Sequence, residues 1–380
     1  MESSFIGSFR PGRVVLLGSG ETSPSGRKAF DEVFRRFDHP PRLALLETPA
    51  GFELNSARVI GRVAEFLRHH LQNYQPQIEI VPARKRGSPF SPDLEEIIAP
   101  LWRAEVIFMG PGSPTYAVRQ LRESLAWQVI LARHYLGADL VLASAATIAI
   151  SRFALPVYEI YKVGEDLHWK EGLNFFGLYG LAMVFIPHWN NNEGGAELDT
   201  SRCFMGKERF AQLIQCLPEP CLVIGIDEKT ALFMDLASMT ARVFGNGGVT
   251  LIHPGDFHES EYGQSLNDAE LSALARQMGS HVHYFQAGTT FPLDICCPFS
   301  LPKPGEGVPT TIWSRALEQA SQPPEEDLPP FEVRELVQAR ETARQNRDWT
   351  TADTLRSQIE ALGWLVQDTR QGPQIRRKAS

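Results

Sequence analysis

Residues 138–151, ADLVLASAATIAIS, decide the fold that this sequence predicts. The apolar run ending at Leu142 predicts a buried strand, and the small residues after Ser144 predict the start of a helix. A serine at such a turn projects its hydroxyl above the edge of the sheet, and the helix N-terminus behind it favours developing negative charge. Ser144 is therefore a candidate nucleophile, although a serine in an alanine-rich junction also occurs for packing alone.

Other strand–loop–helix units precede this one. The run RVVLL at 13–17 leads through Gly18-Ser-Gly-Glu21 into a helical pattern over 27–37, and further strands are predicted at 42–46, 78–81 and 104–108. Strands alternating with helices predict parallel pairing with right-handed crossovers. We therefore expect an α/β fold, a three-layer α/β/α sandwich with a mostly parallel sheet, whose ligands gather at the carboxyl ends of the strands.

The second half of this region continues with strands predicted at 181–186, 221–226 and 232–235. Residues 241–252 predict two more strands, joined as a hairpin at Gly245-Asn-Gly-Gly248. The hairpin indicates an antiparallel edge to the sheet.

Composition divides the chain into three parts. Residues 1–300 form the α/β domain, and 301–330 are rich in proline, glycine and acidic residues, which is typical of a linker. Residues 331–380 show two helical patterns, about 332–346 and 350–362, followed by a short extended segment. We expect a small C-terminal helical hairpin that buries a shared apolar seam.

The overall charge and hydropathy exclude several classes of protein. A net charge of −8 argues against a general nucleic-acid binder. No apolar run approaches the ~20 residues of a membrane span, and the N-terminal residues lack the apolar core of a signal peptide. We therefore expect a cytoplasmic protein with no membrane partner; the sequence leaves a homodimer open.

Neither a metal nor a cofactor is expected. The five cysteines lack metal-ligand spacing and suit buried reduced thiols. A weaker alternative is a metal site in the histidine-rich region, but its spacing matches none of the common zinc patterns. The residues of that alternative are His253, Asp256, His258, Glu259, His281 and His283.

Acyl transfer by a serine needs a base, a group that orients the base, and donors for the oxyanion. His188 follows an apolar strand, as Ser144 does, so one sheet could bring the two together. Glu159 is the candidate acid, with Glu165, Asp166, Asp227 and Glu228 as alternatives. The candidate oxyanion donors are the amides of Gly110, Gly112 and Ala145, and the candidate substrate-binding residues are Arg202, Asn190, Asp227 and Glu228.

In their order along the chain, the motifs GSGE, MGPGS, LASAAT, IPHW and IGIDEKTALFMD resemble those of the cyanophycinase and dipeptidase E serine peptidases. This family belongs to the class I glutamine amidotransferase-like superfamily. The resemblance implies a peptidase fold with Ser144 as nucleophile and His188 as base, and the position of Glu159 resembles that of the acid in the dipeptidase branch. Leu142 and Ala146 stand where the family elbow has glycines.

The C-terminal stretch has a resemblance of its own. The sequence LVQARETARQNRDWTTADTLRSQIEALGWLVQDTRQGPQIRR is similar to the C-terminal end of cysteinyl-tRNA synthetases. In those enzymes the region lies near the tRNA anticodon end, so residues 331–380 could bind tRNA through Arg340, Arg344, Arg347, Arg356 and the terminal basic residues, or could bind a protein partner, which we slightly favour.

Three functions remain open at this stage. The weakest is an RNA-associated factor recruited by the C-terminal residues, which predicts salt-sensitive tRNA binding that is lost when the residues after Phe331 are removed. The other two concern residues 1–300. The first is a serine hydrolase acting on a small peptide or amide, with no cofactor. The second is a non-catalytic binding protein that keeps the fold, motivated by the altered glycines; it predicts that Ser144 and His188 lie more than about 4 Å apart.

Overall fold

The computed structural model describes residues 10–254, 264–265, 273, 280–293, 299–321, 331–346, 348–369 and 372–377. The chain forms two compact units, residues 1–317 and 318–380. No helix among the described residues is long and apolar enough to cross a membrane.

An eight-stranded sheet is the centre of the first unit, with strand order β15-β11-β10-β1-β5-β4-β2-β3. The five neighbouring strands β1, β5, β4, β2 and β3 pair in parallel. β10, β11 and β15 form an antiparallel edge beside β1. The expected α/β fold with a mostly parallel sheet is thus confirmed. The strands are β1 (Val14–Leu17), β2 (Arg42–Leu46), β3 (Gln77–Val81), β4 (Val106–Met109), β5 (Asp139–Ala143), β10 (Thr230–Asp235), β11 (Thr240–Gly245) and β15 (Thr290–Pro292).

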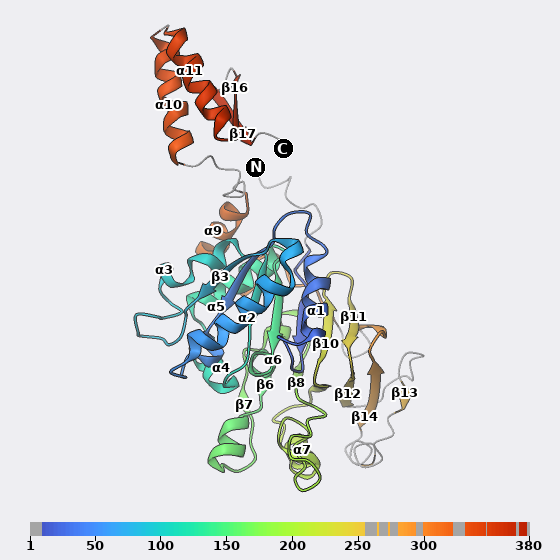
Figure 1. Ribbon diagram of the computed structural model, residues 1–380. Helices are drawn as coiled ribbons and strands as arrows, with labels where there is room; N and C mark the ends of the chain where they lie inside the picture. The colour runs from blue at the N-terminus through green and yellow to red at the C-terminus, as the bar shows by residue number, and fades with distance from the viewer. Residues whose placement is uncertain are drawn as a thin grey trace. The chain divides into compact units, whose positions relative to one another are not determined.

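Helices cover both faces of this main sheet because its strands are apolar on both sides. On one face, Val15 and Leu17 of β1 pack in one apolar cluster with α1 (Pro24–Phe34) and α2 (Ser56–His70) (Figure 1). Val14 and Leu16 face the other layer. That layer contains α5 (Leu125–Tyr135) and α6 (Ala145–Ala149). Two further helices of the first unit are α3 (Glu95–Ile98) and α4 (Pro114–Leu121).

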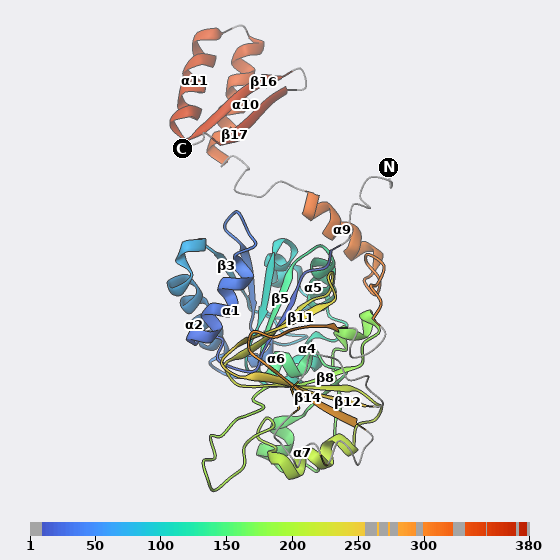
Figure 2. The ribbon, with the colours of Figure 1, turned by 90° about the vertical axis from the view of Figure 1, so that its right-hand side faces the viewer.

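A second sheet, which the sequence did not predict as separate, packs against this second layer. Its strand order is β13-β14-β12-β9-β8, and Figure 2 shows β8, β12 and β14 between the main sheet and α7 (Gly206–Gln215). Phe185 of β8 packs into the core shared with the main sheet, whereas its neighbour Val184 packs with Phe210 of α7. The strands are β8 (Met183–Ile186), β9 (Leu222–Ile226), β12 (Gly248–Pro254), β13 (Gln264–Ser265) and β14 (Ser280–Gln286), and a small pair is formed by β6 (Phe153–Ala154) and β7 (Lys170–Glu171).

The predicted hairpin over residues 241–252 is wrong. β11 pairs with β10 and β15 in the main sheet, whereas β12 pairs with β9 and β14 in the second sheet. The glycine turn between them carries the chain from one sheet to the other, and the Gly248 N–H donates to Asp227 Oδ2 at 2.8 Å. A turn of this composition can join two paired strands or carry the chain from one sheet to the other. Tertiary packing therefore determines which sheet the second strand joins.

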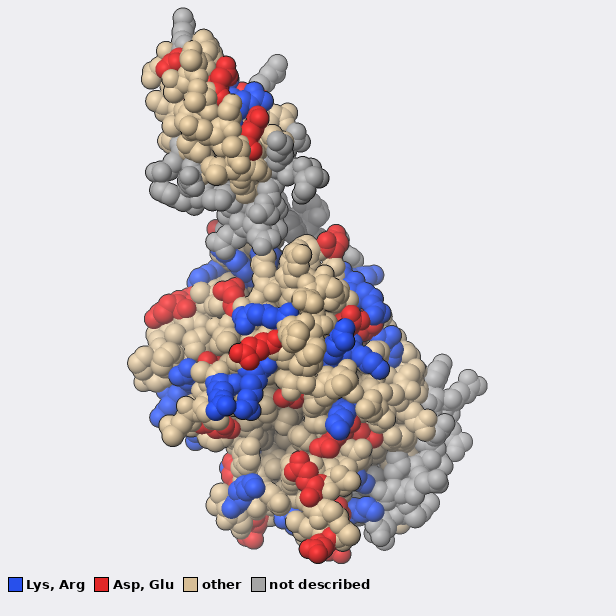
Figure 3. Space-filling model, in the orientation of Figure 1, with Lys and Arg blue, Asp and Glu red and all other residues tan. Residues whose placement is uncertain are grey.

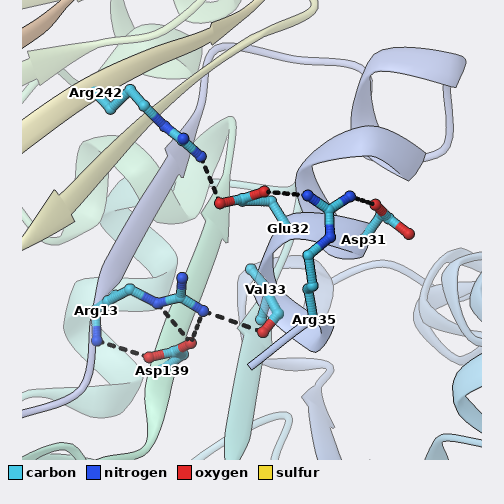
Figure 4. A network of polar contacts seen from close by, with 7 residues as sticks. All are labelled: Arg13, Asp31, Glu32, Val33, Arg35, Asp139 and Arg242. Atoms are coloured by element: carbon cyan, nitrogen blue, oxygen red, sulfur yellow. Dashed lines mark hydrogen bonds and ion pairs between the residues drawn. The ribbon is translucent and has the colours of Figure 1, made fainter. Parts of the chain in front are cut away.

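The amino end of β5 is fixed by a buried ion pair (Figure 4). The Asp139 carboxylate is fully buried and accepts from the backbone N–H of Arg13 at 2.7 Å and from its guanidinium at 2.8 Å. The same guanidinium donates to the Val33 carbonyl of α1. These bonds join β1, β5 and α1 at the edge of the sheet opposite the carboxyl ends.

The expected linker contains a helix, α9 (Thr310–Ser321), whose Ala316 packs into the core of the first unit. The second unit has the expected helical pair, α10 (Phe331–Gln345) and α11 (Trp349–Ala361). Its extended segment β16 (Trp364–Thr369) pairs with a further strand, β17 (Gly372–Arg377). The small core of this unit consists of Val333, Val337, Ile359, Trp364 and Val366.

Candidate active site

Ser144 lies between β5 and α6 in a strained conformation. Its φ is +53° and its ψ is −112°, a region that a non-glycine residue rarely adopts. Its amide donates to the Leu17 carbonyl of the neighbouring strand at 3.3 Å. The small residues Ala145 and Ala146 are buried beside it and let the helix start directly after the strand.

The hydroxyl of Ser144 does not cap the N-terminus of α6. Ser23, Ser113 and Ser124 precede α1, α4 and α5, and each accepts a backbone N–H of the following turn through its side chain. The Ser144 side chain makes no such bond, although it occupies the equivalent position before α6. Because capping is the usual role of a serine at a helix start, the different orientation of Ser144 argues against a purely structural role.

His188 faces Ser144 from the second sheet. It follows β8, has a φ of +51°, and donates its amide to the Gly18 carbonyl at 3.0 Å. Its Nε2 lies 2.9 Å from Ser144 Oγ, which is hydrogen-bond distance. The distance of more than about 4 Å between Ser144 and His188 that a non-catalytic binding protein predicts is therefore not found.

Glu228, at the end of β9, occupies the position of the acid. Its Oε1 lies 3.0 Å from His188 Nδ1 and accepts from Asn191 Nδ2 at 2.9 Å. The hydrogen bond with His188 and the one from Asn191 hold the pKa of the Glu228 carboxyl below its usual value, against the opposing effect of burial. Since a carboxylate only accepts, Nδ1 carries the proton and Nε2 is left to accept from Ser144.

Glu159 does not lie beside His188, so its placement as the acid is corrected. Its Oε1 accepts from Thr115 Oγ1 at 2.6 Å and from Lys170 Nζ at 3.3 Å. Burial raises the pKa of the Glu159 carboxyl, but the hydrogen bond from Thr115 and the charge of Lys170 bring it below its usual value. The chain leaves α6 through β6 before it reaches the π-helical turn Glu159–Val163, and the alternative Glu165 pairs with His168 instead.

A pocket of about 270 Å³ opens over Ser144. It is contained within the first unit, and both Ser144 and His188 line it. The other lining residues are Gly112, Pro114, Ala145, Ile148, Val157, Tyr158, Tyr161, Lys162, Glu193, Cys203 and Phe204. The volume suits a small ligand, because drug-sized ligands occupy pockets of about 300–1,000 Å³.

Two of the three candidate oxyanion donors border this pocket. Gly112 and Ala145 line it, whereas Gly110 is not among the lining residues. The backbone at Gly112 has a φ of +146°, and a Cβ there would lie 2.0 Å from the Pro49 carbonyl oxygen, so only glycine fits. Ala145 is the first residue of α6, and its amide belongs to the helix N-terminus.

Cys203 is the other potential nucleophile in the pocket. Burial raises the pKa of its thiol to about 12. The thiol therefore stays protonated at neutral pH and is a poor nucleophile.

The predicted substrate-binding residues do not line the pocket. The Arg202 side chain is buried, lies 4.0 Å over the Trp189 ring and donates to the Trp189 carbonyl, so it is not a clamp for a ligand. Burial raises the pKa of the Asp227 carboxyl, which accepts from the Gly248 amide and the Tyr284 hydroxyl. Asn190 Oδ1 accepts the Glu228 amide at 2.8 Å, and Glu228 contacts His188 rather than the pocket.

Several pocket and site residues were not identified from the sequence. Asn191, which holds Glu228, lies next to Asn190 in the IPHWNNN motif, and only folding shows which asparagine reaches the carboxylate. Tyr158 and Tyr161 lie at the π-helical turn Glu159–Val163 and Phe204 lies in the turn before α7, and no sequence periodicity marks any of the three.

No group of three or more metal-ligating side chains is found among the described residues. Asp256, His258 and Glu259 of the alternative metal site lie outside the described residues.

Comparison with known proteins identifies the C-terminal segment. Residues 326–376 match the family model of the cysteinyl-tRNA ligase anticodon binding domain. The chain is 50% identical over 48 residues to the cysteine–tRNA ligase of Methanosarcina mazei, 13% of this chain and 10% of the ligase. It is 35% identical over 112 residues to that of Chlamydia abortus, 29% of this chain and 20% of the ligase. The chain thus spans only a small part of the length of these ligases.

The first unit has the fold of a peptidase. The structure of a peptidase from an acI-B1 Actinobacterium aligns with a TM-score of 0.55 and 20% identity, covering 75% of this chain and 98% of that one. A putative peptidase E from Listeria monocytogenes aligns with a TM-score of 0.42 and 15% identity, covering 62% and 99%. At this identity the first similarity establishes the fold, as the sequence motifs predicted.

Proposed function

We propose that this protein is a serine hydrolase that cleaves a small peptide or amide by acyl transfer. The observation that carries the proposal is the 2.9 Å contact between Ser144 Oγ and His188 Nε2 inside a pocket. The strained backbone of Ser144, its uncapped helix and the peptidase fold support it.

In the proposed mechanism, Ser144 Oγ attacks the carbonyl carbon while His188 Nε2 takes its proton. Glu228 holds the Nδ1–H and stabilises the imidazolium that forms. The Gly112 and Ala145 amides stabilise the oxyanion. His188 then protonates the leaving amine, and water releases the acyl group from Ser144 by the reverse proton transfers.

Labelling with a fluorophosphonate probe tests the nucleophile. The native protein is expected to gain one probe adduct that maps to Ser144, and Ser144→Ala is expected to gain none. Ser238→Ala is the matched control, because Ser238 lies in an exposed turn after β10 and lines no part of the pocket. Equal labelling of the native protein and Ser144→Ala would contradict the proposal.

A second function, association with tRNA through the second unit, is favoured by the family match over 326–376. Not all of the expected arginines suit a phosphate contact. The Arg340 side chain is only 3% exposed and pairs with Asp368 at 2.9 Å, and Arg344 pairs with the same carboxylate at 2.8 Å. Arg356 is exposed and bonds to Glu360, and Arg347 lies outside the described residues.

A further inference from the structure

The floor of the pocket over Ser144 is apolar. The lining residues that are buried are Pro114, Ala145, Ile148, Val157 and Cys203. The Cys203 thiol is neutral because its pKa is raised to about 12. None of these five side chains can compensate the charge of a buried carboxylate.

Aromatic rings form the walls above this floor. Tyr161 and Phe204 lie with their ring centroids 5.5 Å apart, and Tyr158 lines the pocket beside them. The Tyr158 ring also contacts Phe52, at 6.4 Å between centroids, and Phe52 is 47% exposed. The apolar surface of the pocket therefore continues outward onto the loop that follows β2.

The charged groups of the pocket lie at its mouth. Lys162 and Glu193 are the Lys, Arg, Asp and Glu residues that line it, and both are exposed. They have opposite signs, and the Lys162 ammonium lies 4.9 Å over the Tyr161 ring. Arg202, the other cation near the site, is buried against Trp189.

Given the hydrolase proposed above, on which this inference rests, we propose that the acyl side of the substrate carries a large apolar or aromatic side chain. During turnover the acyl group stays bonded to Ser144 Oγ, so its side chain must occupy the space around Ser144. Burying apolar surface there is favourable, whereas burying a carboxylate without a partner is costly. An acidic acyl residue is therefore disfavoured.

Covalent probes that carry the acyl side chain test this directly. Diphenyl phosphonates with the side chains of phenylalanine, leucine, asparagine and aspartate react by the same first step: Ser144 Oγ bonds to phosphorus, phenoxide leaves and His188 takes the proton. Leucine, asparagine and aspartate have nearly the same shape, so they separate polarity and charge from size. We expect the phenylalanine and leucine probes to react about 10–100-fold faster than the asparagine probe, and the aspartate probe to react slowest.

A pair of shape-conserving variants locates the effect. Val157→Thr puts a hydroxyl on the pocket floor and is expected to reduce the ratio of leucine to asparagine labelling several-fold. Val163→Thr is the matched control, because Val163 lies at the other end of the helical segment 157–163, is 72% exposed and does not line the pocket. Thermal unfolding of both variants checks that the fold is retained.

The outcomes separate this inference from the proposed hydrolase. If the aspartate or asparagine probe reacts as fast as the leucine probe, or if a fluorophosphonate labels Ser144 while none of the four phosphonates does, the apolar specificity is overturned and the hydrolase stands. A rapid aspartate reaction that is lost in Lys162→Met would assign recognition to the lysine at the mouth. If neither probe class labels Ser144, the hydrolase itself is overturned, and this inference with it.

Discussion

At the scale of single residues, the acid partner of His188 was the least predictable part of the site. Ser144 and His188 each follow an apolar strand, so sequence pattern alone places both at strand ends. Glu228 also follows an apolar strand, but so does Asp227, and the family resemblance pointed to Glu159, so the strand-end position did not select one acid. The distinction depends on where the chain turns after α6, which no local pattern encodes.

Replacing Glu228 by Gln tests the corrected assignment. The amide keeps the shape of the side chain but loses the charge that stabilises the imidazolium, so kcat should fall by about 10²–10⁴-fold. Glu159→Gln, the matched control, should have a much smaller effect because Glu159 bonds to Thr115 and Lys170. Initial rates of hydrolysis provide the measurement, on a peptide amide that carries the acyl side chain of the fastest phosphonate probe. A larger loss in Glu159→Gln than in Glu228→Gln would return the acid role to Glu159.

The lowered pKa of Glu228 also predicts a pH dependence of stability. The unfolded chain binds the proton of this carboxyl at a higher pH than the folded chain does. Its contribution to the free energy of unfolding is therefore fully present above the usual carboxyl pKa and is lost as the pH falls through the lowered folded value. Urea unfolding of the native protein and of Glu228→Gln should give a stability difference that shrinks as the pH falls from neutral to below the usual glutamate pKa of 4.5. A difference that grows on acidification would contradict the direction of the shift.

At the scale of elements, the strand–turn–helix around Ser144 was predictable because strand hydrophobicity and small residues specify it locally. The second sheet was not, because its strands β8, β9 and β12 have the same apolar pattern as the strands of the main sheet. Membership of one sheet or the other is decided by long-range pairing, such as the register of Val249 with Ile226. The failed hairpin has the same cause.

The start of β5 gives a prediction at this scale. Asp139→Ala leaves the partly buried Arg13 guanidinium without its carboxylate and removes the acceptor of the Arg13 backbone N–H. We therefore expect a loss of about 3–5 kcal/mol in the free energy of unfolding. Arg35→Ala at the end of the neighbouring helix is the control (Figure 4), because its pairs with Asp31 and Glu32 are exposed and should contribute little to the free energy of unfolding. Denaturant unfolding compares the two, and equal losses would contradict the role given to burial.

At the scale of the whole molecule, the surface charge bears on the choice of partner. On the face of the first unit drawn in Figure 3, basic and acidic side chains are interspersed. That distribution agrees with the net charge of −8 and does not provide the one-sign surface that nucleic acids require. Any RNA contact is therefore expected from the second unit.

Truncation after Ser321 separates the two proposed activities. The remaining chain keeps the pocket and its core, so fluorophosphonate labelling of Ser144 should be unchanged, whereas binding to tRNA should be lost. In the full chain, that binding should weaken as salt is raised, because it depends on phosphate contacts. Titration of labelled tRNA at two salt concentrations measures this, with Asp368→Asn expected to tighten binding by releasing Arg344. Equal tRNA affinity of the full and truncated chains would contradict the assignment.

The three residues of the proposed catalytic site come from different sheets: Ser144 follows β5 of the main sheet, while His188 and Glu228 follow β8 and β9 of the second. The two sheets pack through one shared apolar core, which sets the distance between Ser144 and His188, and a displacement of about 1 Å is expected to cost about 10²-fold in rate. The rate of the proposed hydrolysis should therefore depend on how the two sheets are aligned. In rising urea, we expect the proposed hydrolysis to be lost before the far-UV circular dichroism signal of the protein begins to change.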